Sequence, residues 1–253
     1  MNIKDITIVM PTSVSVIHPS TEIIDEVIAG VRKHFPENEI ILQIDGLREE
    51  QAHRKEQYDE YKNRILWKCL HEWTNVLPIV FEKHSHQSTM MAETIDLIRT
   101  PLMFYIEGDV TFRDNADINW QLVVDLLDSE KAYTVRFYSF NVKIESAHNY
   151  LMREQEGDFI QTFQWSQQPH LSHVSYYRSV VLPNIIPQYF IEDKFHGRVI
   201  SDCQDSSDGW DKHRLWLYNP IDKDDIRITL HLDGRKGLRK FTSDDDAWGL
   251  TEA

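Results

Sequence analysis

The stretch Leu102–Asp109, which reads LMFYIEGD, decides the fold prediction. Its first five residues, Leu102–Ile106, form a continuous apolar run, which is typical of a strand that is buried on both faces. Glu107 and Asp109 follow directly, on either side of a glycine. Because ligands of open α/β sheets bind outside the carboxyl ends of the strands, this acidic turn is the first candidate for a site.

Outward from this stretch, strands and helices are predicted to alternate through the first 140 residues. The predicted strands are Ile6–Met10, Glu39–Ile44, Leu77–Phe81, Leu102–Ile106 and Ala132–Phe140, and the predicted helices are Thr21–Phe35, Arg48–Trp73, Ser88–Arg99 and Ile118–Leu127. This pattern predicts an α/β fold with a mostly parallel sheet that is flanked by helices. After residue 140 the alternation fades into aromatic and polar segments without a linker or repeat, so we expect one domain over residues 1–253 with an elaborated C-terminal half.

Composition limits the class of protein. The 253 residues are 41% hydrophobic and 27% charged, which excludes a disordered chain, a collagen and a coiled coil. The net charge is −14, from 27 basic and 41 acidic residues, and it disfavours a broad DNA-binding face. The two cysteines, Cys69 and Cys203, stand far apart, and no window has the length of a membrane span, so we expect a cytoplasmic protein.

Other predicted strands also end in residues that could bind a ligand. Pro11 and Thr12 follow the first strand, Asp45 follows the second, and His84 and His86 follow the third. No glycine-rich dinucleotide motif or P-loop is present, so a nucleotide phosphate would need another partner, for which a divalent metal is the obvious choice. The Glu-Gly-Asp turn could supply carboxylate oxygens to that metal, although short acidic turns are also common as solvated turns.

Two later segments carry further candidates. Glu192 and Asp193, in YFIEDKF, either complement the dipole of a helix that they begin or supply a general base. His231, in ITLHLDGRKGLRK, ends a β-branched run as a possible metal ligand. The basic residues that follow it could hold a diphosphate or be a solvated hairpin; they are Arg235, Lys236, Arg239 and Lys240.

The histidine pairs and the tryptophans each allow a functional and a structural role. The pairs His84-x-His86 and His170-x-x-His173 could bind zinc, but no further ligands accompany them, which favours polar residues without a ligand role. The tryptophans could offer faces on which sugar rings stack, although most tryptophans in proteins belong to the core.

Taken together, these segments resemble the GT-A glycosyltransferases, in particular the family 2-like enzymes that use nucleotide-sugars. The resemblance rests on ITIVMPT at 6–12, on Asp45, on HSHQSTMMAETIDLIRTPLMFYIEGDV at 84–110, on YFIEDKF at 189–195 and, more loosely, on His231. Three features depart from the family pattern. Glu107 replaces the first Asp of the D-x-D motif, STMMAETIDLIRT replaces a Gly/Ala/Arg/Asn-rich stretch, and the Arg-rich acceptor helix motif is absent.

The resemblance implies a Rossmann-type GT-A fold, a metal site and a base. Asp109 and His231 would bind a divalent cation, Mn²⁺ or Mg²⁺, and Asp193, next to Glu192, would be the catalytic base of an inverting transfer to an acceptor hydroxyl. The donor would be a nucleotide-sugar, with a UDP-sugar as the expected class, and the acceptor a glycan, a lipid-linked sugar or a modified DNA base.

The resemblance also assigns the two halves of the chain. Residues 1–140 would bind the nucleotide-sugar, and residues 141–253 would bind the acceptor and carry the base. The residues implied in donor binding are Pro11, Thr12, Asp45, Glu107, Arg235 and Lys236.

Four other functions stay open from the sequence. A viral-type enzyme that glycosylates modified DNA bases is disfavoured by the net charge of −14. Nucleotidyl transfer is disfavoured because the loop after the first strand, PTSVSVIHPST, has no Gly, Lys or Arg. A metal-dependent hydrolase could be built on His84, His86 and Asp109, and a non-catalytic module could bind a sugar or nucleotide without turning it over.

Overall fold

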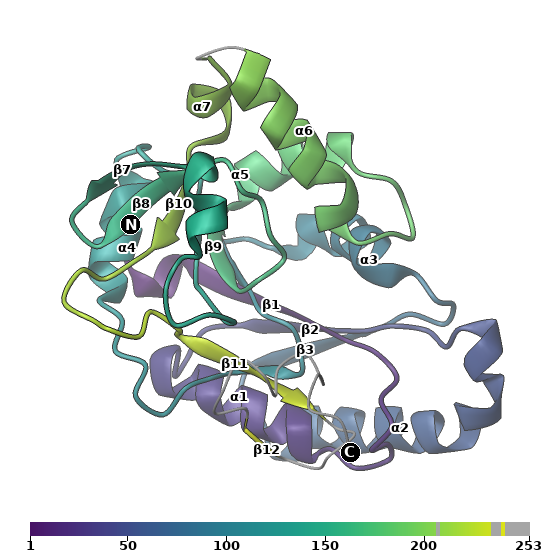
Figure 1. Cartoon of the computed structure of the whole chain (residues 1–253). Helices are drawn as coiled ribbons and strands as arrows, with labels where there is room; N and C mark the ends of the chain where they lie inside the picture. Colours follow the sequence, from purple (N-terminus) through teal and green to yellow (C-terminus); the bar gives the residue numbers. More distant parts are fainter. Residues whose placement is uncertain (206–207, 234–238, 241–253) are drawn as a thin grey trace, which may run out of the picture.

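The structure is a computed structural model that describes residues 1–205, 208–233 and 239–240 (Figure 1). The strands are β1 Ile6–Thr12, β2 Ile40–Ile44, β3 Val76–Val80, β4 Leu102–Tyr105, β5 Val110–Phe112, β6 Thr134–Arg136, β7 Met152–Glu156, β8 Phe159–Thr162, β9 His170–His173, β10 Leu215–Tyr218, β11 Thr229–Asp233 and β12 Arg239–Lys240. Nine of them form one sheet in the order β3-β2-β1-β4-β9-β6-β10-β8-β7, and β12, β11 and β5 form a smaller one.

Helices cover both faces of the large sheet. The α-helices are α1 Glu22–His34, α2 Lys55–His71, α3 His86–Thr94, α4 Trp120–Asp128, α5 Val174–Tyr176, α6 Ile191–Asp205 and α7 Asp208–His213. Shorter 3-10 or π turns are η1 Ile3–Asp5, η2 Glu49–Arg54, η3 Ile95–Leu97, η4 Ser146–Leu151, η5 Tyr177–Val181 and η6 Leu182–Asn184. Among the described residues, no helix combines the length and the apolar character that crossing a membrane requires.

The predicted alternation is confirmed for β3, β2, β1 and β4, which pair in parallel. The apolar runs of β1, β2 and β4 are buried because both faces of the sheet are covered. Ile8 of β1 packs into a core with α1, α2 and α4, whereas its neighbour Val9 packs into a second core with α3, α5 and α6. In Figure 1, α1 and α2 accordingly lie on one side of these strands, and α3 and α6 lie on the other.

Several predicted boundaries were wrong. The predicted helix Arg48–Trp73 begins as the turn η2, and α2 starts only at Lys55. The predicted helix Ser88–Arg99 starts two residues earlier, at His86, and gives way to η3 after Thr94. The predicted strand Ala132–Phe140 is ordered as a strand only over β6.

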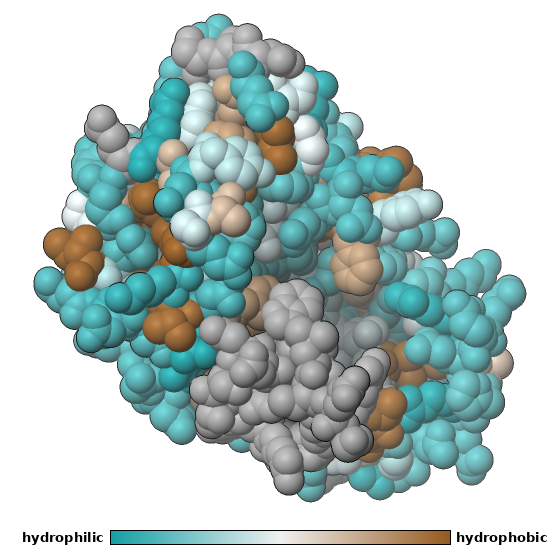
Figure 2. Space-filling model, in the orientation of Figure 1, coloured by the Kyte–Doolittle hydropathy of each residue, from teal (hydrophilic) through white to brown (hydrophobic). Residues whose placement is uncertain are grey.

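The C-terminal half extends the same sheet with antiparallel strands. β9 lies between β4 and β6 and is antiparallel to both, while β10 is parallel to β6. β8 and β7 follow as antiparallel strands at the far edge. The sheet is therefore mixed, and its parallel portion carries the strand ends on which the site prediction depends. On the face shown in Figure 2 the surface is mainly hydrophilic, with apolar side chains in small separate patches.

His170 of β9 is a buried neutral group in this sheet. Its ring is stacked with that of Tyr105, with centroids 5.2 Å apart, and is nearly parallel to that of Tyr177, with centroids 5.7 Å apart. Its Nδ1 lies 2.8 Å from the Gln168 carbonyl oxygen and therefore carries the proton, while Nε2 accepts from the Tyr177 hydroxyl at 2.6 Å. Burial lowers the pKa of His170 to about 4. His173 points to the opposite face and contacts the Leu127 carbonyl, so the two histidines do not form a metal pair.

The contribution of His170 to the stability of the protein is expected to fall as the pH drops from about 6.5 toward 4. Over this range a histidine of ordinary pKa binds a proton in the unfolded chain, whereas His170, with its pKa lowered to about 4, does not bind one in the folded chain. Each extra proton bound by the unfolded chain lowers the free energy of unfolding by about 1.4 kcal/mol per pH unit. Urea unfolding at several pH values measures this slope. His170→Gln should make it shallower, and an unchanged slope would contradict the assignment.

Candidate functional site

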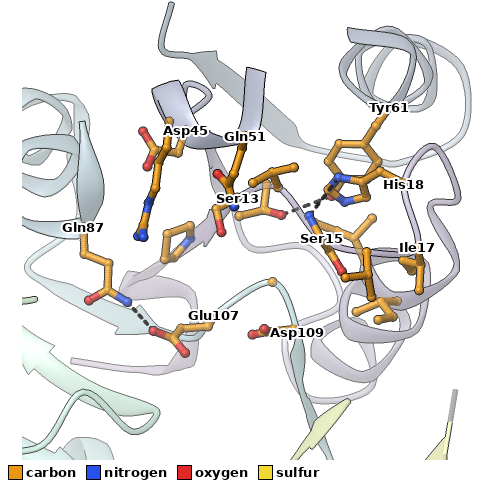
Figure 3. A pocket seen from close by; sticks show the side chains of 18 of the residues that line it. Ser13, Ser15, Ile17, His18, Asp45, Gln51, Tyr61, Gln87, Glu107 and Asp109 are labelled. Carbon is orange, nitrogen blue, oxygen red and sulfur yellow. Dashed lines mark hydrogen bonds between the residues drawn. The ribbon is translucent and has the colours of Figure 1, made fainter. Parts of the chain in front are cut away.

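A cleft of about 450 Å³ opens at the carboxyl ends of β1 and β2 and beside the turn between β4 and β5. Parallel strands end at the same edge of a sheet, which is why residues distant in sequence meet there. In Figure 3, Glu107 and Asp109 lie on one side of the cavity, with Asp45 and Gln51 across from them. The predicted site residues that line the cleft are Pro11, Thr12, Asp45, Glu107, Asp109 and His231.

A glycine fixes the acidic turn against the end of β1. The Gly108 amide donates to the Pro11 carbonyl oxygen at 2.8 Å. A Cβ atom on this residue would lie 3.0 Å from Thr12 Cβ and 3.1 Å from the Pro11 oxygen, closer than most Cβ contacts. Glycine therefore allows the turn to approach β1, which places both acidic side chains of the turn at the cleft.

Asp109 and His231 meet in the lining of this cleft. His231 in β11 stands opposite Val110 of β5, the residue that follows Asp109. The His231 Nε2 atom lies 3.2 Å from Asp109 Oδ2, and the Leu232 amide donates to the Asp109 carbonyl oxygen at 2.7 Å. Both side chains are about half exposed, at 44% and 47%. The small sheet thus brings together the two side chains that were predicted as metal ligands.

Glu107 lies in a strongly acidic environment. Burial, and after it the carboxylates of Asp109 and Glu192, raise the pKa of Glu107 to about 8 against the lowering effect of His231 and of a hydrogen bond from Gln87. This carboxyl group therefore holds a proton at neutral pH. A divalent cation bound beside it would relieve the crowding of negative charge.

The metal-coordinating side chains at the cleft suit a cation that is coordinated by both the protein and its ligand. No group of three or more His, Cys, Asp or Glu side chains within the described part of the chain is placed to hold a metal by itself. The Asp109 carboxylate suits either Mn²⁺ or Mg²⁺ when further oxygens come from a diphosphate and water, and the His231 imidazole favours Mn²⁺ of the two.

Asp45 holds the next loop of the cleft wall. Its carboxylate is buried, and Oδ1 accepts from the amides of Gly46 and Ser85, both at 2.7 Å. Oδ2 accepts from the His86 amide at 3.1 Å and lies 2.8 Å from His84 Nδ1. These partners occupy the lone pairs of the carboxylate, so Asp45 fixes the loop that a bound nucleotide would contact. A direct contact of Asp45 with the base of the nucleotide stays a prediction.

Gly46 is required by the same loop. A Cβ atom there would lie 2.0 Å from the Lys83 carbonyl carbon, which no side chain can tolerate. The loop carries His84 and His86, whose rings are 5.6 Å apart and line the cleft. His84 contacts Asp45, and His86 contacts Phe190. The described contacts of this pair therefore hold the wall of the cleft in place.

Sequence reasoning missed two cations at the cleft. Arg48 and Arg54 line it from η2, which was predicted to be the start of a regular helix. The sequence signal was present, because Arg48 follows the second strand by only a few residues. The cations that were predicted for this role, Arg235 and Lys236, lie outside the described residues, as do the side chains of Arg239 and Lys240.

The two acidic residues that begin α6 point in different directions. Oε2 of Glu192 accepts from the Gln167 amide at 2.7 Å and from the Ser166 hydroxyl at 3.1 Å. This carboxylate is half-buried, and it is the smallest of the influences that raise the pKa of Glu107. Asp193 is exposed to solvent. Neither residue belongs to the lining of the cleft.

The architecture is the GT-A fold, which confirms the predicted fold class. The chain is similar to the mannosyltransferase PcManGT from Pyrobaculum calidifontis, solved with GDP-Man and Mn²⁺, at a TM-score of 0.54 and 10% identity over 92% of this chain and 58% of that one. It is also similar to GalNAc-T7 with UDP, GalNAc and Mn²⁺, at a TM-score of 0.52 and 11% identity over 89% of this chain and 43% of that one.

A third similar structure is S. aureus TarS 1-349 in complex with UDP-GlcNAc, at a TM-score of 0.51 and 10% identity over 91% of this chain and 58% of that one. The chain therefore spans less than two thirds of each of these proteins. No family model and no curated protein sequence matches the chain. At this level of identity, the likeness establishes the fold.

Proposed function

We propose that the chain is a glycosyltransferase that moves a sugar from a nucleotide-sugar donor to an acceptor hydroxyl with the help of a divalent metal. The observation that carries this proposal is the pairing of Asp109 with His231 in the lining of the cleft. The structures similar to this chain support it, because two of them hold Mn²⁺ with a nucleotide or nucleotide-sugar and the third holds a nucleotide-sugar.

In this proposal residues 1–140 bind the donor. The nucleoside lies along the end of β1, beside Thr12 and the loop that Asp45 holds. Its diphosphate lies toward Asp109 and His231, and the guanidinium groups of Arg48 and Arg54 supply positive charge to the same cleft. The predicted contribution of Arg235 and Lys236 stays a prediction. A UDP-sugar is the expected donor, and the ligands of the similar structures make a GDP-sugar the first alternative.

The reaction we propose is an inverting displacement. The acceptor oxygen forms a bond to the anomeric carbon as the bond from that carbon to the diphosphate oxygen breaks, and the nucleoside diphosphate leaves. A bound divalent cation, held by Asp109 and His231, would stabilise the negative charge of the leaving group. The proton of the acceptor hydroxyl passes to a carboxylate at the start of α6, in the acceptor half of the chain.

Of the two carboxylates at that position, Glu192 is the better candidate for the base. Asp193 was predicted from the family pattern, but its side chain is exposed. The side chain of Glu192 is half-buried, and both of its described hydrogen bonds go to Oε2 and hold it against the loop at 166–167, which leaves Oε1 to accept a proton. We therefore propose Glu192 as the base, with Asp193 as the alternative.

A thermal-shift screen of nucleoside diphosphates and nucleotide-sugars tests the proposed function. Each ligand is measured with Mn²⁺, with Mg²⁺ and with EDTA. A ligand present at about 100 times its Kd stabilises the folded state by about 2.7 kcal/mol, or roughly 5–10 °C for a domain of this size. We expect such a shift with one nucleotide class and its loss in EDTA. A folded protein that shifts with none of them would contradict the proposal.

The same screen, together with an assay for released nucleoside diphosphate, addresses the other candidate functions. A non-catalytic module would shift with a donor but would not release nucleoside diphosphate from it. A hydrolase built on His84 and His86 would be stabilised by a transition metal alone, without a nucleotide. The described contacts of His84 and His86 with Asp45 and Phe190 give this last function no specific support.

A further inference from the structure

Aromatic side chains at the mouth of the cleft are exposed, but they are not tryptophans. The tryptophans Trp120, Trp165, Trp210 and Trp216 are between 2% and 8% exposed and belong to the core. Tyr189 and Phe190, which directly precede α6, are 49% and 47% exposed. Phe190 lines the cleft and meets the ring of His86 edge-on, with centroids 4.3 Å apart.

The segment that carries these two rings is fixed to α3, beside which it runs in Figure 1. The Tyr189 amide donates to the Ser88 hydroxyl at 3.1 Å, and the Ser88 amide donates to the Tyr189 carbonyl at 3.3 Å. The Gln188 amide donates to the Thr89 hydroxyl at 3.0 Å, and its side-chain amide contacts the His84 carbonyl at 3.3 Å. These bonds hold the backbone that presents the rings to solvent.

The surroundings of the two rings are polar. Gln188, Asp193 and Lys194 are exposed beside them, and Lys194 Nζ lies 5.8 Å from the Tyr189 ring centroid. Phe190 stands two residues before Glu192 in the chain. A molecule stacked on Phe190 would therefore lie beside the donor cleft, on the segment that leads into the helix with the proposed base.

We propose that Tyr189 and Phe190 form an acceptor platform that binds a sugar ring of the acceptor. This inference rests on the proposed function and names its acceptor class as a carbohydrate. A pyranose has an apolar face of C–H groups that packs on an aromatic ring, and a rim of hydroxyl groups that hydrogen bonds to polar side chains. The half-exposed Phe190 ring at the cleft, with the exposed Tyr189 ring next to it in the chain and polar side chains nearby, offers both kinds of contact. A lipid chain would instead need a continuous apolar groove, and the apolar patches in Figure 2 are small and separate.

Saturation-transfer NMR with a panel of simple glycosides tests the acceptor platform. The panel contains the methyl α- and β-glycosides of glucose, galactose, mannose and N-acetylglucosamine at millimolar concentration. Spectra are recorded with and without the nucleoside diphosphate and metal that give the largest thermal shift. We expect transfer to the C–H protons of at least one glycoside, and at least a tenfold loss of it in Phe190→Ala and Tyr189→Ala.

Three controls make the result specific. Phe190→Tyr keeps a ring and should retain binding. Trp67→Ala removes an aromatic side chain of α2 that is 53% exposed and does not line the cleft, and it should change nothing. Melting temperatures of the alanine variants should stay close to that of the unchanged protein, because the rings they remove are half exposed.

Two outcomes would overturn the platform. One is glycoside binding that is equal in the unchanged protein and in both alanine variants. The other is no response to any glycoside, and binding of prenyl-phosphate micelles that the same variants lose would then assign the rings to a lipid acceptor. The spectra without nucleotide keep this test separate from the proposed function, which fails only if no nucleotide binds.

Discussion

Asp109→Asn is expected to abolish both metal-dependent nucleotide binding and sugar transfer. The substitution removes the anionic member of the pair with His231, whose nitrogen lies 3.2 Å from the Asp109 carboxylate. Asparagine is a weaker metal ligand and brings no charge to oppose that of the cation. We expect a loss of about 10²- to 10³-fold in transfer, in line with electrostatic groups that stabilise developing negative charge. The Mn²⁺-dependent thermal shift should disappear with it.

The fold of this variant should be intact. Asp109 is about half exposed, and the bond that its carbonyl accepts from the Leu232 amide does not involve the side chain. A matched control is Asp222→Asn, which removes the same charge from an exposed position outside the cleft. Calorimetric titration of the nucleotide with Mn²⁺ compares the two variants. Equal affinity in Asp109→Asn and Asp222→Asn would rule out Asp109 as a metal ligand.

Glu192→Gln is expected to lower the rate of transfer by 10²- to 10⁴-fold, the range typical for loss of a general base. The glutamine keeps a side-chain oxygen that can accept from the Gln167 amide, so the loop at 166–167 should stay in place. Donor affinity should therefore change little. Asp193→Asn, at the exposed neighbouring position, should retain transfer within about threefold.

Transfer rates and donor affinities of the two variants decide between the carboxylates. Because a base acts on the acceptor and not on the nucleotide, the effect should fall on the rate and spare the Kd of the donor. Loss of transfer in Asp193→Asn, with near-normal transfer in Glu192→Gln, would return the role of base to Asp193. Equal losses of donor affinity in both would point to a role of α6 in donor binding.

The parallel part of the fold was predictable because its strands are buried on both faces. Continuous apolar runs such as Ile40–Ile44 and Leu102–Tyr105 need such an environment, and few folds provide it. The position of the cleft followed from the same topology, since Asp45 and Asp109 each come shortly after a parallel strand and parallel strands end at the same edge of the sheet. The proximity of His231 to Asp109 depended on the family resemblance, because no local pattern predicts that β11 pairs with β5.

The antiparallel insertion could not be predicted in the same way. β9 is only four residues long and contains two histidines, and it is stabilised by contacts with β4 and β6 rather than by its own pattern. The strand predicted over Ala132–Phe140 is shorter for a related reason, because its pairing partners span only a few residues.

The orientation of side chains was the other feature that the sequence could not predict. The sequence places Glu192 and Asp193 together, but their difference in exposure depends on the residue at which α6 begins and on the Ser166–Gln167 loop that meets it. The same holds for Arg48 and Arg54, which reach the cleft because η2 interrupts the expected helix. Helix boundaries are the least certain part of any sequence prediction, and here they decide which charges face the site.

The most direct test of the metal-dependent glycosyltransferase is a crystal structure with Mn²⁺ and the nucleoside diphosphate that binds most tightly, with data collected at the manganese absorption edge. We predict an anomalous peak within coordination distance of Asp109 Oδ2 and His231 Nε2, with the diphosphate bound to the same ion. An anomalous peak at His84 and His86, or a nucleotide bound away from the Asp109 cleft, would contradict the account.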